Sequence, residues 1–284
     1  MTICIGTICR DKDQHPLIVG ASDRLLVVGG MKSEPFQTKV AQLSDKVAAM
    51  ISGTVPTCTT ILQDALLQVS ELDKNSILVR DVARICARAF ARCRRAEAES
   101  LLLTPLSLSA SDLTHPDERM SPYVLDKCIQ EMRKYELEAE LMVVGIDKLG
   151  AHIYVIENPG YPHPQDDIGY AIIGSGGWHA KAYLMSMNYT NSWPLQDSLF
   201  VTHAAKRRAE SDIYVGTKTD MFIIAPQLPY APLPVEIISE LDTNYDQAKV
   251  KKDKIELEAF QLLKTYLEKT FPSTTPPSAA PSEK

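Results

Sequence analysis

Three residues near the start of the chain could together perform nucleophilic catalysis. Thr2 directly follows Met1, and threonine is small enough for methionine aminopeptidase to remove that methionine. Removal would give Thr2 both a hydroxyl nucleophile and a free α-amine, which titrates near ~7.7–8.0 and can accept the hydroxyl proton. Asp23 ends an apolar run, and Lys39 follows in the next segment.

The motifs around these residues occur in a fixed order along the chain. Gly-Ala-Ser-Asp-Arg occupies 20–24, Lys-Val-Ala-Gln-Leu-Ser-Asp occupies 39–45, and a β-rich run ends with Ser-Gly at 52–53. Tyr-Ala-Ile-Ile-Gly-Ser-Gly-Gly at 170–177 and Ala-Glu-Ser-Asp at 209–212 follow. Together they resemble a proteasome β-type subunit of the N-terminal nucleophile hydrolases, and the doubled glycine is similar to the bacterial HslV-type peptidase. The resemblance covers about residues 2–225.

The resemblance implies a fold and an activity. The fold class is α+β, as a four-layer αββα sandwich, and the domain is expected to span 1–226. The implied activity is that of a threonine-type endopeptidase. By the same resemblance Lys39, held close to Thr2 by Asp23, would lower the pKa of the Thr2 hydroxyl and amine. The Thr2 hydroxyl would attack a peptide carbonyl, and water activated by the α-amine would hydrolyse the resulting ester.

The resemblance also implies roles for further residues. The Gly53 N–H would stabilise the tetrahedral oxyanion, a contribution of ~3–4 kcal/mol where such a donor is lost. Ser175 and Asp212 would hydrogen-bond around the α-amine and orient it. The walls of the substrate pocket would be formed by three apolar residues, Leu26, Ile51 and Val55. From them we expect a preference for apolar side chains before the scissile bond.

Hydrophobic periodicity predicts the elements that must position these residues. Strands are expected at 2–9, 17–21, 25–29, 47–52, 140–146, 152–157, 170–173 and 219–224, and helices at 57–71, 78–98, 122–135, from about 178, and at 195–210. Loops are expected at 99–118 and, because of its prolines, at 161–167. Blocks of helices between blocks of strands favour α+β layering over regular β-α alternation.

The C-terminal part of the chain differs in composition from the rest. Four prolines between 226 and 234 interrupt regular structure, so we expect a C-terminal extension at 227–271 with an amphipathic helix at 242–270. Residues 272–284 are rich in Pro and Ser and are predicted to be disordered.

Composition excludes several other classes of function. The 284 residues carry a net charge of −6 without a long basic run, which argues against nucleic acid as a partner. We find neither an apolar run long enough to span a membrane nor a signal peptide, and therefore expect a cytoplasmic protein. The six cysteines are dispersed, with no metal-ligand spacing, so no metal, cofactor or disulfide is predicted.

Three functions remain open at this stage. The first is a peptidase that cleaves peptides or unfolded proteins within a homo-oligomeric ring, with an ATP-dependent unfoldase as a further partner. The second is an amidase that uses Thr2 on a small-molecule amide without a ring. The third is a catalytically silent assembly subunit, which retention of Met1 would favour.

Overall fold

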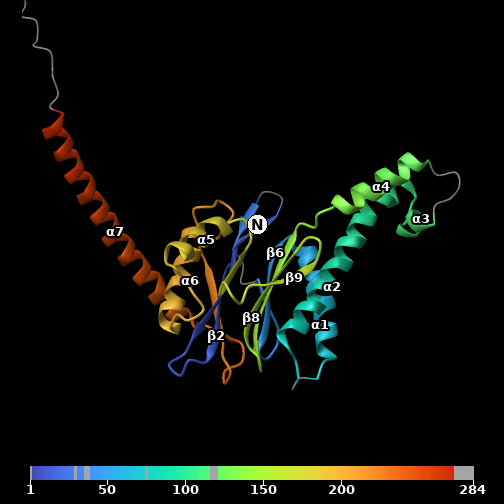
Figure 1. Cartoon of the computed structure of the whole chain (residues 1–284), viewed down its shortest axis with the longest axis horizontal. Helices are drawn as coiled ribbons and strands as arrows, with labels where there is room; N and C mark the ends of the chain where they lie inside the picture. Colours follow the sequence, from blue (N-terminus) through green and yellow to red (C-terminus); the bar gives the residue numbers. More distant parts are fainter. Residues whose placement is uncertain (1, 29–30, 35–38, 74–75, 116–120, 272–284) are drawn as a thin grey trace, which may run out of the picture. The chain divides into compact units, whose positions relative to one another are not determined.

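The computed structural model describes residues 2–28, 31–34, 39–73, 76–115 and 121–271. The chain forms two compact units that divide after Ile238. All the sheets and the helices up to α6 lie in the first unit. Its architecture is mixed, with helices and antiparallel sheets (Figure 1).

The first sheet contains the start of the chain in an interior strand. Its strand order is β10-β1-β2-β11-β12, and every pair is antiparallel. The bounds are β1 (Cys4–Arg10), β2 (Pro16–Asp23), β10 (Tyr170–Ile173), β11 (Thr219–Ile224) and β12 (Ala231–Pro232). Residues 4–9 of β1 are buried at consecutive positions, so both faces of this sheet are covered.

The second sheet has the order β5-β6-β7-β8-β9 and is also antiparallel throughout. The bounds are β5 (Val40–Ser44), β6 (Val47–Gly53), β7 (Ala139–Asp147), β8 (Gly150–Glu157) and β9 (Tyr161–Pro164). A separate pair consists of β3 (Leu26–Val28) and β4 (Met31–Ser33).

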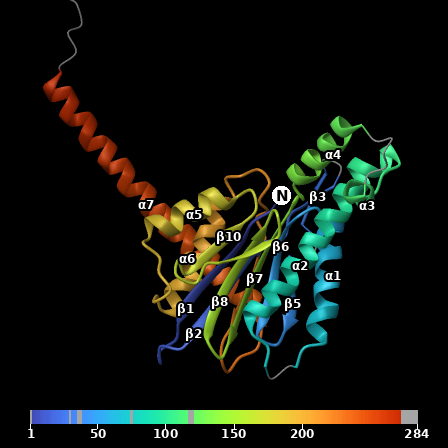
Figure 2. The same ribbon diagram turned by 45° about the vertical axis from the view of Figure 1, so that its right-hand side comes forward.

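Helices cover the outer faces of the two sheets. Figures 1 and 2 show α1 (Val55–Ser70) and α2 (Val79–Ala98) on one side of the strands and α5 (Gly177–Ser186) and α6 (Leu195–Ala209) on the other. Three apolar clusters hold these parts together. Phe90 of α2 packs in one with Leu141 of β7, Met50 and Phe222 meet between the sheets, and Val201 of α6 packs in the third with Ile5 of β1.

Two predicted loops contain regular structure. Within 99–118, Glu99–Leu103 continues α2 as a π-helical turn, Thr104–Leu106 forms a 3₁₀ turn, and α3 (Ala110–Thr114) follows. Ser109 starts α3 through a capping box with Asp112, a signal that the loop prediction overlooked. The predicted loop at 161–167 contains β9, which tolerates Pro162 and Pro164 because it lies at the edge of its sheet.

The other helical predictions are confirmed to within a few residues, except at the C-terminus. α4 spans Pro122–Lys134, and α7 spans Val235–Thr270, seven residues longer at its start than the predicted 242–270 because it begins directly after Pro234. Side chains at 246–270 of α7 are all exposed. The tail at 272–284, predicted to be disordered, lies outside the described residues, as does residue 29 of the predicted strand at 25–29.

Candidate active site

The pairing of β1 with β2 brings Thr2 and Asp23 together. Cys4 lies opposite Ser22 in this antiparallel pair, so the residues just before β1 reach the end of β2. The Asp23 N–H donates to the Ile3 carbonyl at 3.2 Å, and the Ile3 N–H donates to Asp23 Oδ1 at 2.9 Å. The Thr2 hydroxyl donates to the same carboxylate oxygen.

Lys39 reaches this pair from the second sheet. It directly precedes β5, and its carbonyl accepts the Ile51 N–H of β6 at 3.0 Å. Its Nζ donates to Asp23 Oδ1 at 2.8 Å and to Thr2 Oγ1. Thr2, Asp23 and Lys39 are only 2%, 0% and 8% exposed, so the three groups interact with little screening by solvent.

The buried carboxylate of Asp23 is held by five hydrogen bonds. Besides those of Thr2, Ile3 and Lys39 to Oδ1, the N–H groups of Leu25 and Gly216 donate to Oδ2 at 3.0 Å and 2.9 Å. Burial by itself raises the pKa of Asp23. The Lys39 ammonium and the hydrogen bonds outweigh burial, so the net effect lowers this pKa and keeps the carboxylate ionised.

A cavity of about 1170 Å³ opens beside Thr2 and Lys39. Gly53 and Ser175 line it as well, and so do the three residues that the sequence placed in a substrate pocket, namely Leu26, Ile51 and Val55. Asp212 does not line this cavity. The cavity therefore places the Thr2–Lys39 pair opposite a wall that includes apolar side chains.

Two glycines of the cavity lining occupy positions that other residues could not. Gly53 has φ +134°, and an added Cβ would lie 2.2 Å from the Glu138 carbonyl oxygen. Gly174 has φ +98°, and its Cβ would lie 2.1 Å from the Thr2 carbonyl oxygen. Because backbone atoms would clash in both cases, Gly53 lets the end of β6 approach the segment before β7, and Gly174 lets the β10–α5 turn approach Thr2 closely.

Ser175 and Asp212 lie apart from the buried cluster. Ser175 is exposed, and Asp212 Oδ1 accepts the Tyr214 N–H at 2.9 Å within its own turn. Within the described part of the chain, no hydrogen bond joins either residue to Thr2. Their predicted role around the α-amine stays a prediction.

Lys206 is a functional candidate that the sequence analysis did not single out. It is fully buried in α6, where its Nζ donates to Glu210 Oε1 at 2.7 Å and to the Thr217 carbonyl at 2.9 Å. Burial lowers the pKa of Lys206. Its bond to Thr217 fixes the loop whose Gly216 N–H reaches Asp23. The i,i+4 spacing to Glu210 predicts an ion pair but gives no indication of burial.

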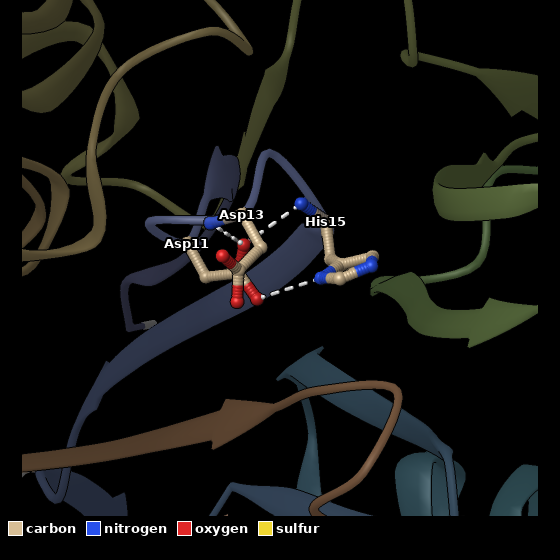
Figure 3. A group of neighbouring side chains, drawn as sticks. All are labelled: Asp11, Asp13 and His15. Atoms are coloured by element: carbon tan, nitrogen blue, oxygen red, sulfur yellow. Dashed lines mark hydrogen bonds and ion pairs between the residues drawn. The ribbon is translucent and has the colours of Figure 1, made fainter.

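The turn between β1 and β2 contains a second group of polar side chains (Figure 3). Among the described residues, Asp11, Asp13 and His15 are the group whose ligand atoms lie close enough to share an ion. Asp11 Oδ1 accepts the N–H groups of Asp13 and His15, each at 2.8 Å, and Asp11 Oδ2 lies 3.1 Å from His15 Nδ1. These bonds account for the arrangement as a stabilised turn.

Comparisons with known proteins do not place the chain in a family. No protein-family model matches the sequence, and no curated protein matches it significantly. Over the described residues, none of the helices has both the length and the apolar character needed to cross a membrane.

Proposed function

We propose that this chain is a threonine-type endopeptidase of the N-terminal nucleophile hydrolase class, similar to proteasome β-type subunits. The order of helices, sheet, sheet and helices in the first unit supports the assignment to a four-layer αββα sandwich. The position of Thr2 directly before the interior strand β1, in a cavity wall, supports its assignment as the nucleophile.

One observation carries the proposal. The Thr2 hydroxyl is hydrogen-bonded to both Lys39 Nζ and Asp23 Oδ1 in a buried setting, yet it borders a cavity of about 1170 Å³. An ammonium donating to a hydroxyl oxygen stabilises the alkoxide and so promotes nucleophilic attack. A threonine with a purely structural role needs neither this charge nor the cavity.

The proposed reaction is acyl transfer in two steps. After removal of Met1, the Thr2 α-amine accepts the hydroxyl proton as Oγ1 attacks the peptide carbonyl. The Gly53 N–H stabilises the oxyanion, and the proton passes to the departing amine as the C–N bond breaks. Water, activated by the same amine, then hydrolyses the Thr2 ester and frees the new carboxylate. Lys39 stays protonated and stabilises the developing charge on Oγ1.

The substrate in this proposal is a peptide or an unfolded protein. We further propose a homo-oligomeric ring, because an open threonine peptidase would endanger its host, with an ATP-dependent unfoldase as a partner. Each catalytic group named above belongs to the chain itself, so the proposed reaction uses no cofactor.

The decisive experiment treats the purified protein with a peptide epoxyketone and analyses the N-terminal peptide by mass spectrometry. This reagent needs a hydroxyl and a free α-amine on one residue, so we expect an adduct on Thr2 with Met1 absent. Thr2→Ser should retain the adduct and Thr2→Ala should lose it. Lys39→Met should slow adduct formation by about 10²- to 10³-fold.

The control is Thr60→Ala, which removes an exposed hydroxyl from α1 outside the cavity lining and should leave adduct formation unchanged. Met1 retained on the native protein would contradict the proposal and favour a silent assembly subunit. Adduct formation by a monomer that cleaves small amides but no peptide would favour the amidase.

A further inference from the structure

Four glutamates line the cavity beside Thr2. They are Glu136, Glu138, Glu140 and Glu157, from the segment leading into β7 and from the end of β8. Among the described residues that line the cavity, Lys39 is the cation, and its Nζ is already bound to Asp23 Oδ1 at 2.8 Å. The cavity wall therefore carries an excess of carboxylates.

The register of β7 directs Glu140 toward the cavity. Leu137 and Ala139 belong to the core cluster beneath α1 and α2, so Glu140, at the alternate position of β7, points to the opposite face, toward the first sheet. Gly53 faces Ala139 in the β6–β7 pair, and the Thr54 N–H donates to the Glu138 carbonyl at 3.2 Å. The acidic segment is therefore fixed beside the proposed oxyanion donor.

Glu140 brings a carboxylate close to the nucleophile. Its Oε2 accepts the Gly174 N–H at 2.6 Å, which links β7 to the turn after β10. Gly174 in turn packs directly against the Thr2 backbone. This hydrogen bond occupies Oε2 and places the charge of Glu140 at the inner end of the cavity.

The combination of apolar and acidic wall suits one kind of side chain. Leu26, Ile51 and Val55 line the same cavity and can cover an aliphatic stem, whereas the glutamates can pair with a charged head group. Lys and Arg have this construction. An apolar side chain would desolvate the carboxylates without replacing their hydrogen bonds, and an acidic one would be repelled.

We propose that this cavity selects substrates with a Lys or Arg side chain beside the scissile bond, in place of the apolar preference expected from Leu26, Ile51 and Val55 alone. The inference rests on the proposed peptidase function. The glutamates act as specificity determinants, and Thr2, Lys39 and Asp23 perform the chemistry on any substrate that binds.

The test compares three fluorogenic peptides that differ only in the residue before the cleaved bond, which is Arg, Leu or Glu. We expect kcat/KM for the Arg peptide to exceed that for the Leu peptide by about tenfold, the sum of several partly exposed ion pairs. The advantage should shrink as salt rises from 0.05 M to 0.5 M, because ions screen such pairs.

A triple variant, Glu138→Gln, Glu140→Gln and Glu157→Gln, should abolish the Arg advantage while cleavage of the Leu peptide persists. The glutamine at 140 can still accept the Gly174 N–H, so the turn is preserved. The matched control is Glu71→Gln, an exposed glutamate outside the cavity, which should keep the advantage.

The inference would be overturned if the unmodified protein cleaved the Leu peptide as fast as the Arg peptide or faster, and if the triple variant left this ratio unchanged. The proposed function would still stand in that case. If no peptide is cleaved and no epoxyketone adduct forms, the proposed function falls. Fluorescence anisotropy of the same labelled peptides with the Thr2→Ala chain then still decides the inference. Equal affinity for the Arg and Leu peptides would overturn it.

Discussion

Asp23 carries an ionised side chain in the protein interior, where burying a charge costs free energy. It is fully buried, yet five donors from separate segments of the chain converge on its two oxygens. A buried charge with this many partners is stable, whereas removal of one side of the pair leaves the other charge uncompensated. At the scale of single residues, the site therefore depends on the Asp23–Lys39 pair as a unit.

We expect Asp23→Asn to lower the free energy of unfolding by about 3–5 kcal/mol at pH 7, because Lys39 then loses its buried counter-charge. Urea unfolding measures the change. Adding Lys39→Met to this variant should restore part of the loss. If the loss in the free energy of unfolding of the double variant equals the sum of the losses of the two single variants, the two residues do not act as a pair.

This stabilisation should also depend on pH. The folded-state pKa of Asp23 lies below its ordinary value. Its contribution is therefore complete above the ordinary carboxyl pKa and is lost as the pH falls through the lowered one. The stability difference between the unmodified chain and Asp23→Asn should consequently narrow in acid, and an unchanged difference down to pH 3 would contradict this assignment.

The resemblance to a known family indicates the members of the buried cluster but not the residues that support it. It points to Thr2, Asp23 and Lys39, which are hydrogen-bonded together. It does not point to Gly216 or Lys206, because one acts through a backbone N–H and the other through burial in α6. Neither property can be read from residue type.

At the scale of elements, two glycines with nearly the same backbone angle allow a matched comparison. Gly53 has φ +134° and Gly150 has φ +136°, but an added Cβ meets the Glu138 carbonyl at 2.2 Å only at Gly53, and nothing within 4 Å at Gly150. Gly150→Ala should cost about 1–3 kcal/mol through backbone strain alone.

Gly53→Ala should cost clearly more and should also slow epoxyketone labelling, since β6 must shift away from β7 next to Thr2. Thermal unfolding and labelling rates of both variants provide the measurement. Equal destabilisation by the two substitutions would mean that the close approach of β6 to β7 contributes nothing.

A second element-scale prediction concerns His152 on β8, at the edge of a different cavity. Its Nδ1 lies 2.7 Å from Asp166, and Nε2 lies 3.3 Å from Asp147, which also accepts the Val79 N–H at the start of α2. The hydrogen bond that the His152 ring donates to the Asp166 carboxylate is the main reason that the pKa of His152 is raised, although burial opposes it.

A raised pKa stabilises the fold below the ordinary histidine pKa, and this contribution is lost as the pH rises through the folded-state value. His152→Gln should therefore cost more at pH 5.5 than at pH 8.5, by about 1 kcal/mol. Urea unfolding at both values tests this, with the exposed His179→Gln as control. A larger cost at pH 8.5 would contradict the assignment.

Most elements could be predicted from hydrophobic periodicity, and two short strands show why some others could not. β9 is an edge strand, which needs only one hydrogen-bonded neighbour and so accepts the two prolines that suggested a loop. β12 spans only Ala231–Pro232 and pairs with β11, so it has no periodicity of its own. Each of these two strands forms by pairing with the strand that precedes it in the chain, and its own residues carry no pattern that announces the pairing.

At the scale of the whole molecule, α7 presents apolar side chains to solvent. Large exposed residues in its C-terminal half include Ile255, Phe260, Leu263, Tyr266 and Leu267. Apolar groups gathered on an exposed helix favour association. We expect the full chain to form oligomers, and a chain ending at Lys249 to form smaller ones with its unfolding temperature within about 2–4 °C of the original.

Light scattering coupled to gel filtration measures the mass of both forms. A chain that lacks only 272–284 controls for the shortening itself. Identical oligomers from the full chain and the chain ending at Lys249 would show that association, if present, uses another surface.

The donors that surround Asp23 also set an order of events during protein synthesis. Thr2, Asp23 and Lys39 leave the ribosome early, but the Gly216 N–H that completes the carboxylate's shell is translated much later. The strands on either side of the β1–β2 pair, β10 and β11, also come from the second half of the chain. A nascent chain therefore lacks part of the hydrogen bonding around Asp23, and the site around the proposed nucleophile forms fully only when translation is well advanced.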